Sequence, residues 1–127
     1  AGMLAGALYG VVQYFAEPYF FHPAQVLLDY PIAFGALGLA GLLQTRELTA
    51  VSVGIGGRFL AHFVSGVVFF ATYAFQNPVY LGLDIVGPYW VYTYSALYNG
   101  TYLLPELVIS LFLMSILIRR NLIALYK

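Results

Sequence analysis

The sequence contains no cysteine and few charged residues. Its 127 residues include five Lys or Arg and five Asp or Glu, so only 8% are charged and the formal net charge is zero. Without cysteine the chain forms no disulfide, thiolate metal site or cysteine nucleophile. Without a basic excess it lacks the electrostatic footprint of a nucleic-acid-binding protein, and we exclude nucleic acid as a partner.

The sequence is instead rich in apolar side chains. Hydrophobic residues make up 62% of the chain, and its mean hydropathy is +0.86. Soluble domains carry about 25% charged residues, so this many apolar side chains must face lipid. The apolar runs are continuous, which favours helices over a membrane β-barrel. We expect an all-α, polytopic membrane helical bundle that forms one domain over residues 1–127.

Four apolar segments are candidates for spanning helices. They cover residues 2–16, 23–43, 48–75 and 92–118. A helix needs roughly 20 residues to cross the hydrocarbon core, so the first segment is short for a span. This short segment and a start at Ala1 without Met lead us to expect a processed chain or a fragment.

The basic residues predict an orientation. Lys and Arg favour the cytoplasmic side of a membrane, and four alternating helices bring most of them to one side. We therefore predict a multi-pass plasma-membrane protein with a cytoplasmic C-terminus and with the 17–23 and 76–91 loops outside. Arg58 falls in the same half of the third segment as the basic side. The basic side holds Arg46, Arg119, Arg120 and Lys127, and the opposite side holds Glu17, His22 and Asp84.

Three ionisable residues lie inside the expected spans, where such groups are costly and often functional. They are Asp29, His62 and Glu106. Each also has a structural interpretation, because Asp29 could simply pair with His62 and Glu106 could cap a kink. Pro31 lacks an N–H and clashes with the preceding turn, so it interrupts the second segment. Irregular backbone at this depth is tolerated against protein or a wet cavity, which places Asp29 and Tyr30 at a cavity wall.

Helical spacing adds polar and aromatic residues to this group. His62, Gly66 and Phe70 recur every four residues and share a face, although Gly66 could serve only helix packing. Asn99, Tyr102 and Glu106 share a face of the last segment. Aromatic residues, 18% of the chain, form interfacial belts in membrane proteins, but those near carboxylates could also cage a flat cation. The outer half has carboxylates and no basic residue, so it favours a cationic ligand over a phosphorylated one.

Several familiar motifs do not fit the sequence. The glycine-rich stretch at 54–57 follows no strand, so it is not a nucleotide-binding loop. His62 and Ser65 lack an activated-serine elbow, and no local ligand spacing supports a metal. We expect no cofactor and no metal. Two alternatives stay open: an intramembrane enzyme that uses His62 with Asp29 or Glu106, and a structural membrane subunit.

Three blocks of the sequence resemble the thiamine-specific substrate-binding component of energy-coupling-factor transporters. They are PAQVLLDYPIAFGALGLAG at 23–41, RFLAHFVSGVVFF at 58–70 and YSALYNGTYLLPE at 94–106, and they occur in the family's order. The resemblance implies a six-helix membrane fold with a thiamine pocket near the outer face. This chain would be the C-terminal part of that fold and would lack its two N-terminal helices.

The resemblance also implies which residues bind thiamine. Asp29 stands where the family has a glutamate, which is one methylene longer, and Phe70 stands where it has a stacking tryptophan. The carboxylate would balance or hydrogen-bond the vitamin, and the aromatic side chains would stack on its two rings. Together with Gly66, the implied set is Tyr19, Asp29, Tyr30, His62, Gly66, Phe70, Tyr94 and Asn99.

The family's mechanism is capture without chemistry. The component would bind thiamine outside and dock in the lipid bilayer on a module with a coupling transmembrane subunit and two ATPases. We recognise no nucleotide-binding motif in this chain, which agrees with that division of labour. The 76–91 loop is longer than the resemblance leads us to expect, and Trp90 could contribute to the site from there.

Overall fold

The computed structural model describes residues 1–43, 45–76 and 78–123, and this part of the chain is almost entirely helical. The predicted all-α class is therefore confirmed, with one short hairpin added. The elements are α1 (Gly2–Ala16), α2 (Pro23–Leu27), the π-helical turn η1 (Leu28–Ile32), α3 (Ala33–Ala36), the 3₁₀ turn η2 (Leu37–Leu42), α4 (Glu47–Phe69), α5 (Ala71–Gln76), β1 (Val79–Tyr80), β2 (Leu83–Asp84) and α6 (Trp90–Arg119).

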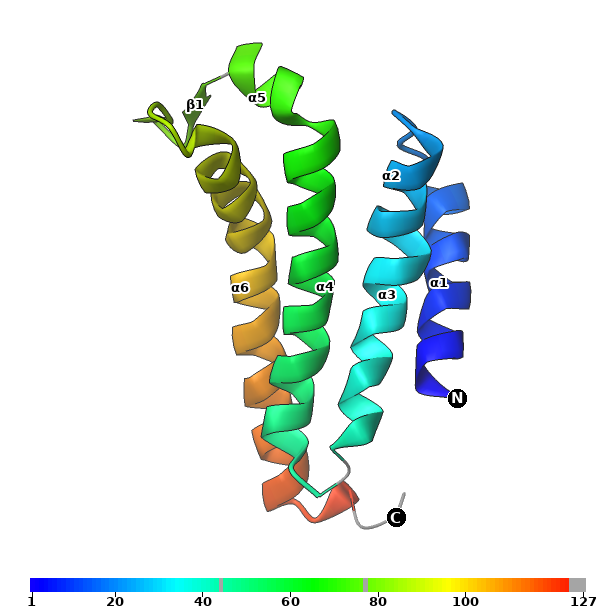
Figure 1. The fold of residues 1–127 in the computed structure, drawn as a ribbon. Coiled ribbons are helices and arrows are strands. Elements are labelled where there is room, and N and C mark those ends of the chain that lie inside the picture. Colours follow the sequence, from blue (N-terminus) through cyan, green and yellow to red (C-terminus); the bar gives the residue numbers. More distant parts are fainter. Residues whose placement is uncertain (44, 77, 124–127) are drawn as a thin grey trace.

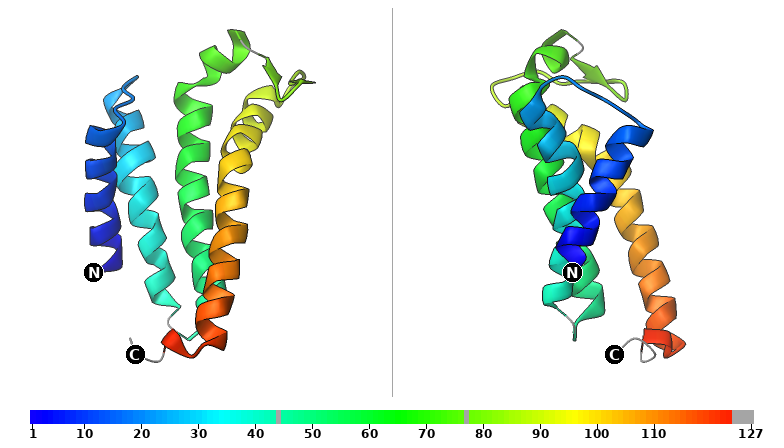
Figure 2. Two further views of the ribbon diagram at one scale, coloured as in Figure 1. Left: turned by 180° about the vertical axis from the view of Figure 1, so that it is seen from behind. Right: turned by 90° about the vertical axis from the view of Figure 1, so that its right-hand side faces the viewer.

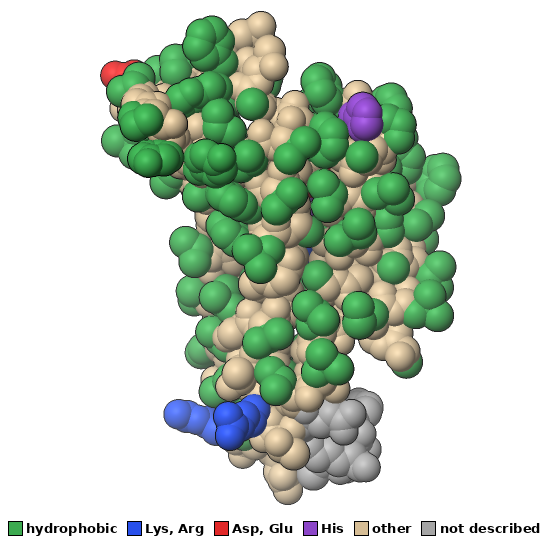
Figure 3. Space-filling model, in the orientation of Figure 1, with side chains coloured by type: hydrophobic (Ala, Val, Ile, Leu, Met, Phe, Trp, Pro, Cys, Tyr) green, Lys and Arg blue, Asp and Glu red, His purple; other side chains and the backbone are tan. Residues whose placement is uncertain are grey.

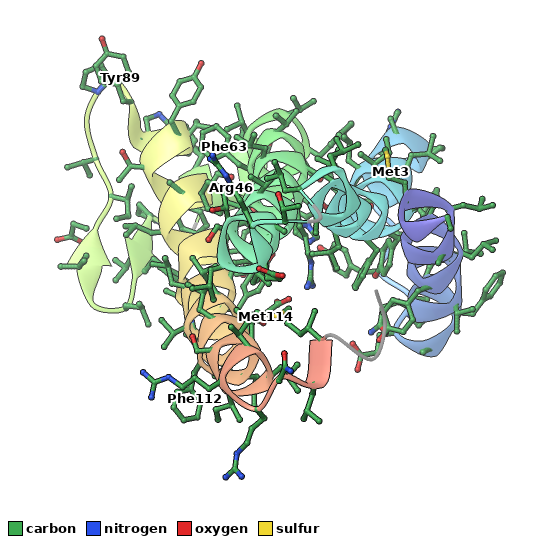
Figure 4. The ribbon with its side chains drawn as sticks, turned by 90° about the horizontal axis from the view of Figure 1, so that it is seen from below. Met3, Arg46, Phe63, Tyr89, Phe112 and Met114 are labelled. Carbon is green, nitrogen blue, oxygen red and sulfur yellow. The ribbon has the colours of Figure 1, made fainter. Side chains whose placement is uncertain are left out.

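The helices form four columns that run in alternating directions (Figure 1). The second column is the continuous helical run from α2 to η2. Each column packs on the next one along the chain, α1 on the second column, that column on α4, and α4 on α6. Viewed along the helices, the columns follow an open arc, with Met114 on the side of α6 toward the inside of the arc (Figure 4).

Three of the four columns are long and apolar enough to cross a membrane: Pro23–Leu42, Glu47–Phe69 and Trp90–Arg119. The fourth, α1, is apolar but has only 15 residues, so three columns rather than four meet the length of a span. Large apolar side chains cover the outer surface, among them Phe112, which is 64% exposed, and Val68, which is 60% exposed. These side chains would be buried in a soluble protein, and lipid is the solvent that suits them.

The second column is irregular where the sequence places Asp29, Tyr30 and Pro31. The backbone widens there into a π-helical turn, in which the Ala33 N–H donates to the Leu28 carbonyl. This wider turn accommodates the missing N–H and the ring of Pro31 without ending the helix. Helix α1 packs directly on the turn. Its Gly10 lies so close that a Cβ at this position would overlap the Tyr30 carbonyl.

The third predicted segment, 48–75, proves to be two helices. Helix α4 ends at Phe69, Phe70 leaves helical geometry, and α5 begins at Ala71. The rings of the first loop pack against this break, His22 on Phe69 at 5.2 Å between centroids and Tyr19 on Phe70 at 5.8 Å. The break therefore lies against the first loop.

Basic and acidic side chains gather at opposite ends of the molecule. The 17–22 loop, α5 and the β1–β2 hairpin lie at one end, and the start of α4 and the end of α6 lie at the other (Figure 1, Figure 2). On the face drawn in Figure 3, blue basic side chains gather at the second end, whereas red acidic and purple histidine side chains lie at the first. Lys127 lies outside the described residues.

Arg58 does not belong to the basic end. It lies in the middle of α4, its side chain is 15% exposed, and it forms an ion pair with Glu106 of α6. The sequence placed it in the basic half of the third segment, whereas it lies at the centre of α4. A charge at the centre of a span is tolerated when a neighbouring helix supplies its counter-ion, and Glu106 does so here.

Candidate functional site

Asp29 and His62 meet between two spanning columns. Asp29 Oδ1 lies 3.0 Å from His62 Nδ1, and both side chains are largely buried, with exposed fractions of 18% and 12%. Asp29 reaches this position from the π-helical turn, and His62 reaches it from the middle of α4. Two ionisable groups that the sequence singled out separately are therefore hydrogen-bonded partners.

Gln25 holds the second oxygen of Asp29. The Gln25 side-chain N–H donates to Asp29 Oδ2 at 2.7 Å, and its Oε1 accepts from the Phe21 N–H at 3.1 Å. Gln25 is 1% exposed, so water hardly competes for its two hydrogen bonds. The Asp29 carboxylate is consequently oriented by donors on both oxygens.

Arg58 and Glu106 extend the cluster into α6. Arg58 Nη1 donates to both Glu106 oxygens, at 2.8 and 2.9 Å, and Arg58 Nε donates to His62 Nε2 at 3.4 Å. The guanidinium also lies over the Phe34 ring, 4.4 Å from its centroid. A chain of polar contacts thus joins Asp29, His62, Arg58 and Glu106 across three columns.

Asn99 approaches His62 from α6. Its Nδ2 donates to the His62 carbonyl at 3.3 Å and to the Ser95 carbonyl at 2.9 Å. The Tyr102 hydroxyl donates to Asn99 Oδ1 at 2.6 Å, which fixes the amide orientation. Asn99 is 4% exposed, and Tyr102 is 39% exposed, with its ring at a steep angle to the His62 ring and 6.0 Å between centroids.

Gly66 lies where α4 and α6 come closest. A Cβ at this position would overlap the Ser95 side chain and contact Asn99 Nδ2. Ser95 Oγ donates to the Phe63 carbonyl at 2.9 Å, which ties the two helices together at the same level. The geometry shows the packing role that was one of two interpretations from the sequence, and it brings Asn99 next to His62.

Aromatic side chains gather at the end of the cluster that faces the first loop. The Tyr30 hydroxyl donates to the Glu17 carbonyl at 2.8 Å and accepts from the Tyr19 N–H at 3.2 Å, so it fastens the first loop. The Tyr19 ring stacks on Phe70 at 5.8 Å, and Phe21 also lies 5.8 Å from Phe70. Tyr19, Tyr30 and Phe70 therefore form one connected aromatic group.

Tyr94 occupies a different setting from the other candidate residues. It is buried with Ala74 and Ile85 in a small outer core beneath the hairpin. The Tyr80 ring lies 5.5 Å from the Tyr94 ring, and the Tyr80 hydroxyl is 2.8 Å from Thr101 Oγ1. The β1–β2 hairpin thus packs on α6, and Trp90 at the start of α6 contacts Phe75, with 5.7 Å between ring centroids.

Two open hollows lie toward the basic end of the molecule. They measure about 430 and 390 Å³ and are lined by the first half of α4 and the second half of α6, and Leu37 and Ala40 of the second column also line the smaller one. Glu106 lies at the edge of the second hollow, whereas Asp29, His62 and Asn99 line neither. Within the described residues, no three His, Asp or Glu side chains are placed to hold a metal ion.

Three residues that shape the site were not predicted as site residues: Gln25, Arg58 and Tyr102. Gln25 and Arg58 each precede a recognised site residue by four positions, the spacing at which helical side chains become neighbours. That spacing could have found both of them, although the π-helical turn blurs it for Gln25. Tyr102 was seen on the face of Asn99, but its spacing alone did not reveal a hydrogen bond.

The fold and the cluster define a polytopic helical membrane protein in which ionisable side chains from three columns bond to one another between the helices. The chain belongs to the family of thiamine transporter proteins (Thia_YuaJ), whose family model matches residues 1–125. The family resemblance drawn from the three sequence blocks is therefore confirmed.

Two curated relatives are similar over much of the chain. "Thiamine transporter ThiT" of Bacillus subtilis is 33% identical over 138 aligned positions, which cover 92% of this chain and 64% of the relative. "Thiamine transporter ThiT" of Lacticaseibacillus paracasei is 29% identical over 113 positions, which cover 76% of this chain and 51% of the relative. The chain thus spans between about half and two thirds of the length of these relatives. No solved structure matches it.

Proposed function

We propose that the protein containing this chain binds thiamine and takes it up as the membrane-embedded substrate-binding component of an energy-coupling-factor transporter. The observation that carries the proposal is the convergence of Asp29, His62 and Asn99 from three columns on one buried cluster. Family membership and two relatives named as thiamine transporters support the choice of ligand.

The chemistry of the cluster suits a flat organic cation. The Asp29 carboxylate supplies negative charge. The Asn99 amide and the Tyr102 hydroxyl are bonded to each other and would exchange that bond for hydrogen bonds to a heterocycle edge. Phe70 and Tyr19 provide aromatic rings at the first loop, and cation–π attraction is worth about 0.5–2 kcal/mol per contact. The proposed binding set is Tyr19, Asp29, Tyr30, His62, Gly66, Phe70, Tyr94 and Asn99.

The proposal includes the rest of the transporter. The part of the relatives that this chain does not match would supply two further helices and close the site on the open side of the arc. The basic end with Arg46 and Arg119 would face the cytoplasm, as positively charged ends do, and the aromatic end would face outside. A coupling transmembrane subunit and two ATPases would then drive release of thiamine inward.

The enzyme alternative fits the geometry less well. His62 Nε2, the nitrogen that would act as a base, already accepts from Arg58. Ser65 Oγ is buried and has no hydrogen-bond partner among the described residues, so it does not form the nucleophile–base contact that acyl transfer needs. Both curated relatives are named as transporters.

Titration calorimetry with the purified full-length protein and its Asp29→Asn variant tests the proposal. Asparagine keeps the shape of the side chain but removes its charge, and we expect a loss of about 2–3 kcal/mol in thiamine binding, or roughly 30- to 150-fold. Asp84→Asn, a matched change in the exposed hairpin, should leave binding unaltered. Equal affinity of the wild type and Asp29→Asn would refute the role of this carboxylate. If the wild type binds no thiamine and Asp29→Asn lowers the melting temperature, the structural-subunit alternative would be favoured.

A further inference from the structure

We infer that Arg58 and Glu106 form a positioning pair that fixes both the proton and the net charge of the thiamine site. The inference rests on the function proposed above. It assigns a role to two residues that lie outside the proposed ligand set. Arg58 contacts His62 of that set, and Glu106 contacts Arg58.

The first step concerns the proton on His62. A guanidinium group can only donate hydrogen bonds, so His62 Nε2 must accept from Arg58 Nε and carries no proton. The remaining ring proton then lies on Nδ1, which donates to Asp29 Oδ1 at 3.0 Å. Arg58 therefore keeps His62 neutral and in one tautomer, with its ring N–H aimed at the Asp29 carboxylate.

The charges of the four polar groups do not cancel. Asp29 and Glu106 each carry one negative charge, Arg58 carries one positive charge, and neutral His62 carries none. The four groups therefore hold one net negative charge, which matches a ligand with a single positive charge. Without Glu106, the guanidinium would cancel the charge of Asp29 and oppose a cation beside it.

The third step concerns rigidity. Arg58 is held on three sides, by two bonds to Glu106, by His62, and by the Phe34 ring at 4.4 Å. Its side chain is 15% exposed, so water screens its charge only weakly. A cation fixed in this way acts on the site as a constant local charge.

The other groups that face His62 are uncharged. Tyr102 of α6 presents its ring at 6.0 Å, and Asn99 donates to the His62 backbone carbonyl. Asp29 from the second column and Arg58 from α4 are the charged groups in contact with the imidazole among the described residues. The proton position is consequently set by these two.

Paired affinity measurements test the charge role. Thiamine and an uncharged isostere, with a triazole in place of the thiazolium, are titrated into the full-length protein. In Glu106→Gln the uncompensated Arg58 should weaken thiamine binding roughly tenfold or more, while the isostere keeps its affinity. The double variant Arg58→Gln/Glu106→Gln restores one net negative charge and should recover most of the thiamine affinity. Asp84→Asn controls for loss of a distant carboxylate.

Nitrogen NMR of ¹⁵N-histidine-labelled protein tests the tautomer role. Protonated and unprotonated ring nitrogens have well-separated ¹⁵N shifts, and the signal missing in His62→Gln identifies His62. The wild type should show a proton on His62 Nδ1 and none on Nε2. In the double variant the guanidinium no longer donates to Nε2, so this nitrogen should carry a proton in part of the molecules. A purely structural role for Arg58 would leave the tautomer unchanged.

The outcomes separate the two proposals. Equal weakening of thiamine and isostere in Glu106→Gln, or an Nε2 that stays unprotonated in the double variant, would overturn the positioning role. Absence of thiamine binding in the wild type would contradict the proposed function instead, and the NMR measurement would still decide the proton position. If Glu106→Gln does not fold, the double variant carries the test, because removing both members of the Arg58–Glu106 pair leaves neither of them buried without its counter-ion.

Discussion

Gln25 donates a hydrogen bond of 2.7 Å to Asp29 one turn further along the same column. This contact connects Gln25, which was not predicted as a site residue, to the carboxylate on which the proposed site depends. It crosses the boundary between α2 and the π-helical turn, so the backbone irregularity and the orientation of Asp29 are coupled.

Replacing Gln25 with leucine should therefore cost stability. Gln25→Leu leaves Asp29 Oδ2 and the Phe21 N–H without their partner, and we expect a loss of about 1–3 kcal/mol in the free energy of unfolding. Denaturation of the purified protein in detergent measures this change. Gln13→Leu is the matched control, because the Gln13 contact with Glu17 is exposed and 3.3 Å long. A control that loses as much stability as Gln25→Leu would contradict the assignment.

Phe70 should respond to ring size in ligand affinity. Phe70→Trp offers a stronger cation–π face, and we expect tighter thiamine binding by about 0.5–1 kcal/mol, or roughly two- to fivefold. Phe70→Leu keeps apolar contact but removes the ring, so it should weaken binding by a similar amount or more. Calorimetric titration measures both. Identical affinities for the three side chains would show that Phe70 only packs against Tyr19 and Phe21.

Gly66 should be intolerant of any side chain. In Gly66→Ala the new methyl overlaps Ser95 and forces α4 away from α6, and we expect a destabilisation of about 1–3 kcal/mol from overpacking. Gly56 provides the control on the same helix, because nothing lies within 4 Å of its added Cβ. Gly56→Ala should be neutral or stabilise by up to about 1 kcal/mol through helix propensity. Thermal unfolding of the two variants, side by side, decides whether the close contact is required.

Cysteine labelling can test the orientation. The described chain has no cysteine, so single replacements in a cysteine-free background report on individual sites. A membrane-impermeant maleimide should label Asp84→Cys in intact cells, and it should label Arg119→Cys only after permeabilisation. The reverse pattern would place the aromatic end in the cytoplasm and would contradict the proposed direction of uptake.

Some of the site follows from the sequence because lipid makes polar groups expensive. Asp29 and His62 each need a partner inside a span, and a pairing between them was one of the stated interpretations. The interruption at Pro31 was equally visible, since proline disturbs a helix wherever it stands inside one. The all-α class follows from continuous apolar runs that can satisfy their backbone only as helices.

Other features depend on contacts between distant residues, and the sequence did not reveal them. The break at Phe70 lies within an unbroken apolar run, so hydropathy cannot show it. In the structure, rings of the first loop pack against this position. Arg58 was interpreted as a marker of membrane sidedness, but its counter-ion Glu106 is 48 positions away. Tyr94 shares a helix with Asn99, yet packing of the hairpin places it in a separate core.

The π-helical turn at Leu28–Ile32 links the length of this stretch to the position of Asp29. A π-helical turn holds one residue more than the α-helical turn it replaces. Removing one residue would therefore let the chain return to an ordinary α-helix, with the segments before and after it nearly in register. The widened turn and the four-residue step from Gln25 to Asp29 would be lost. A deletion between these two residues should therefore preserve most of the packing of this column and displace the Asp29 carboxylate.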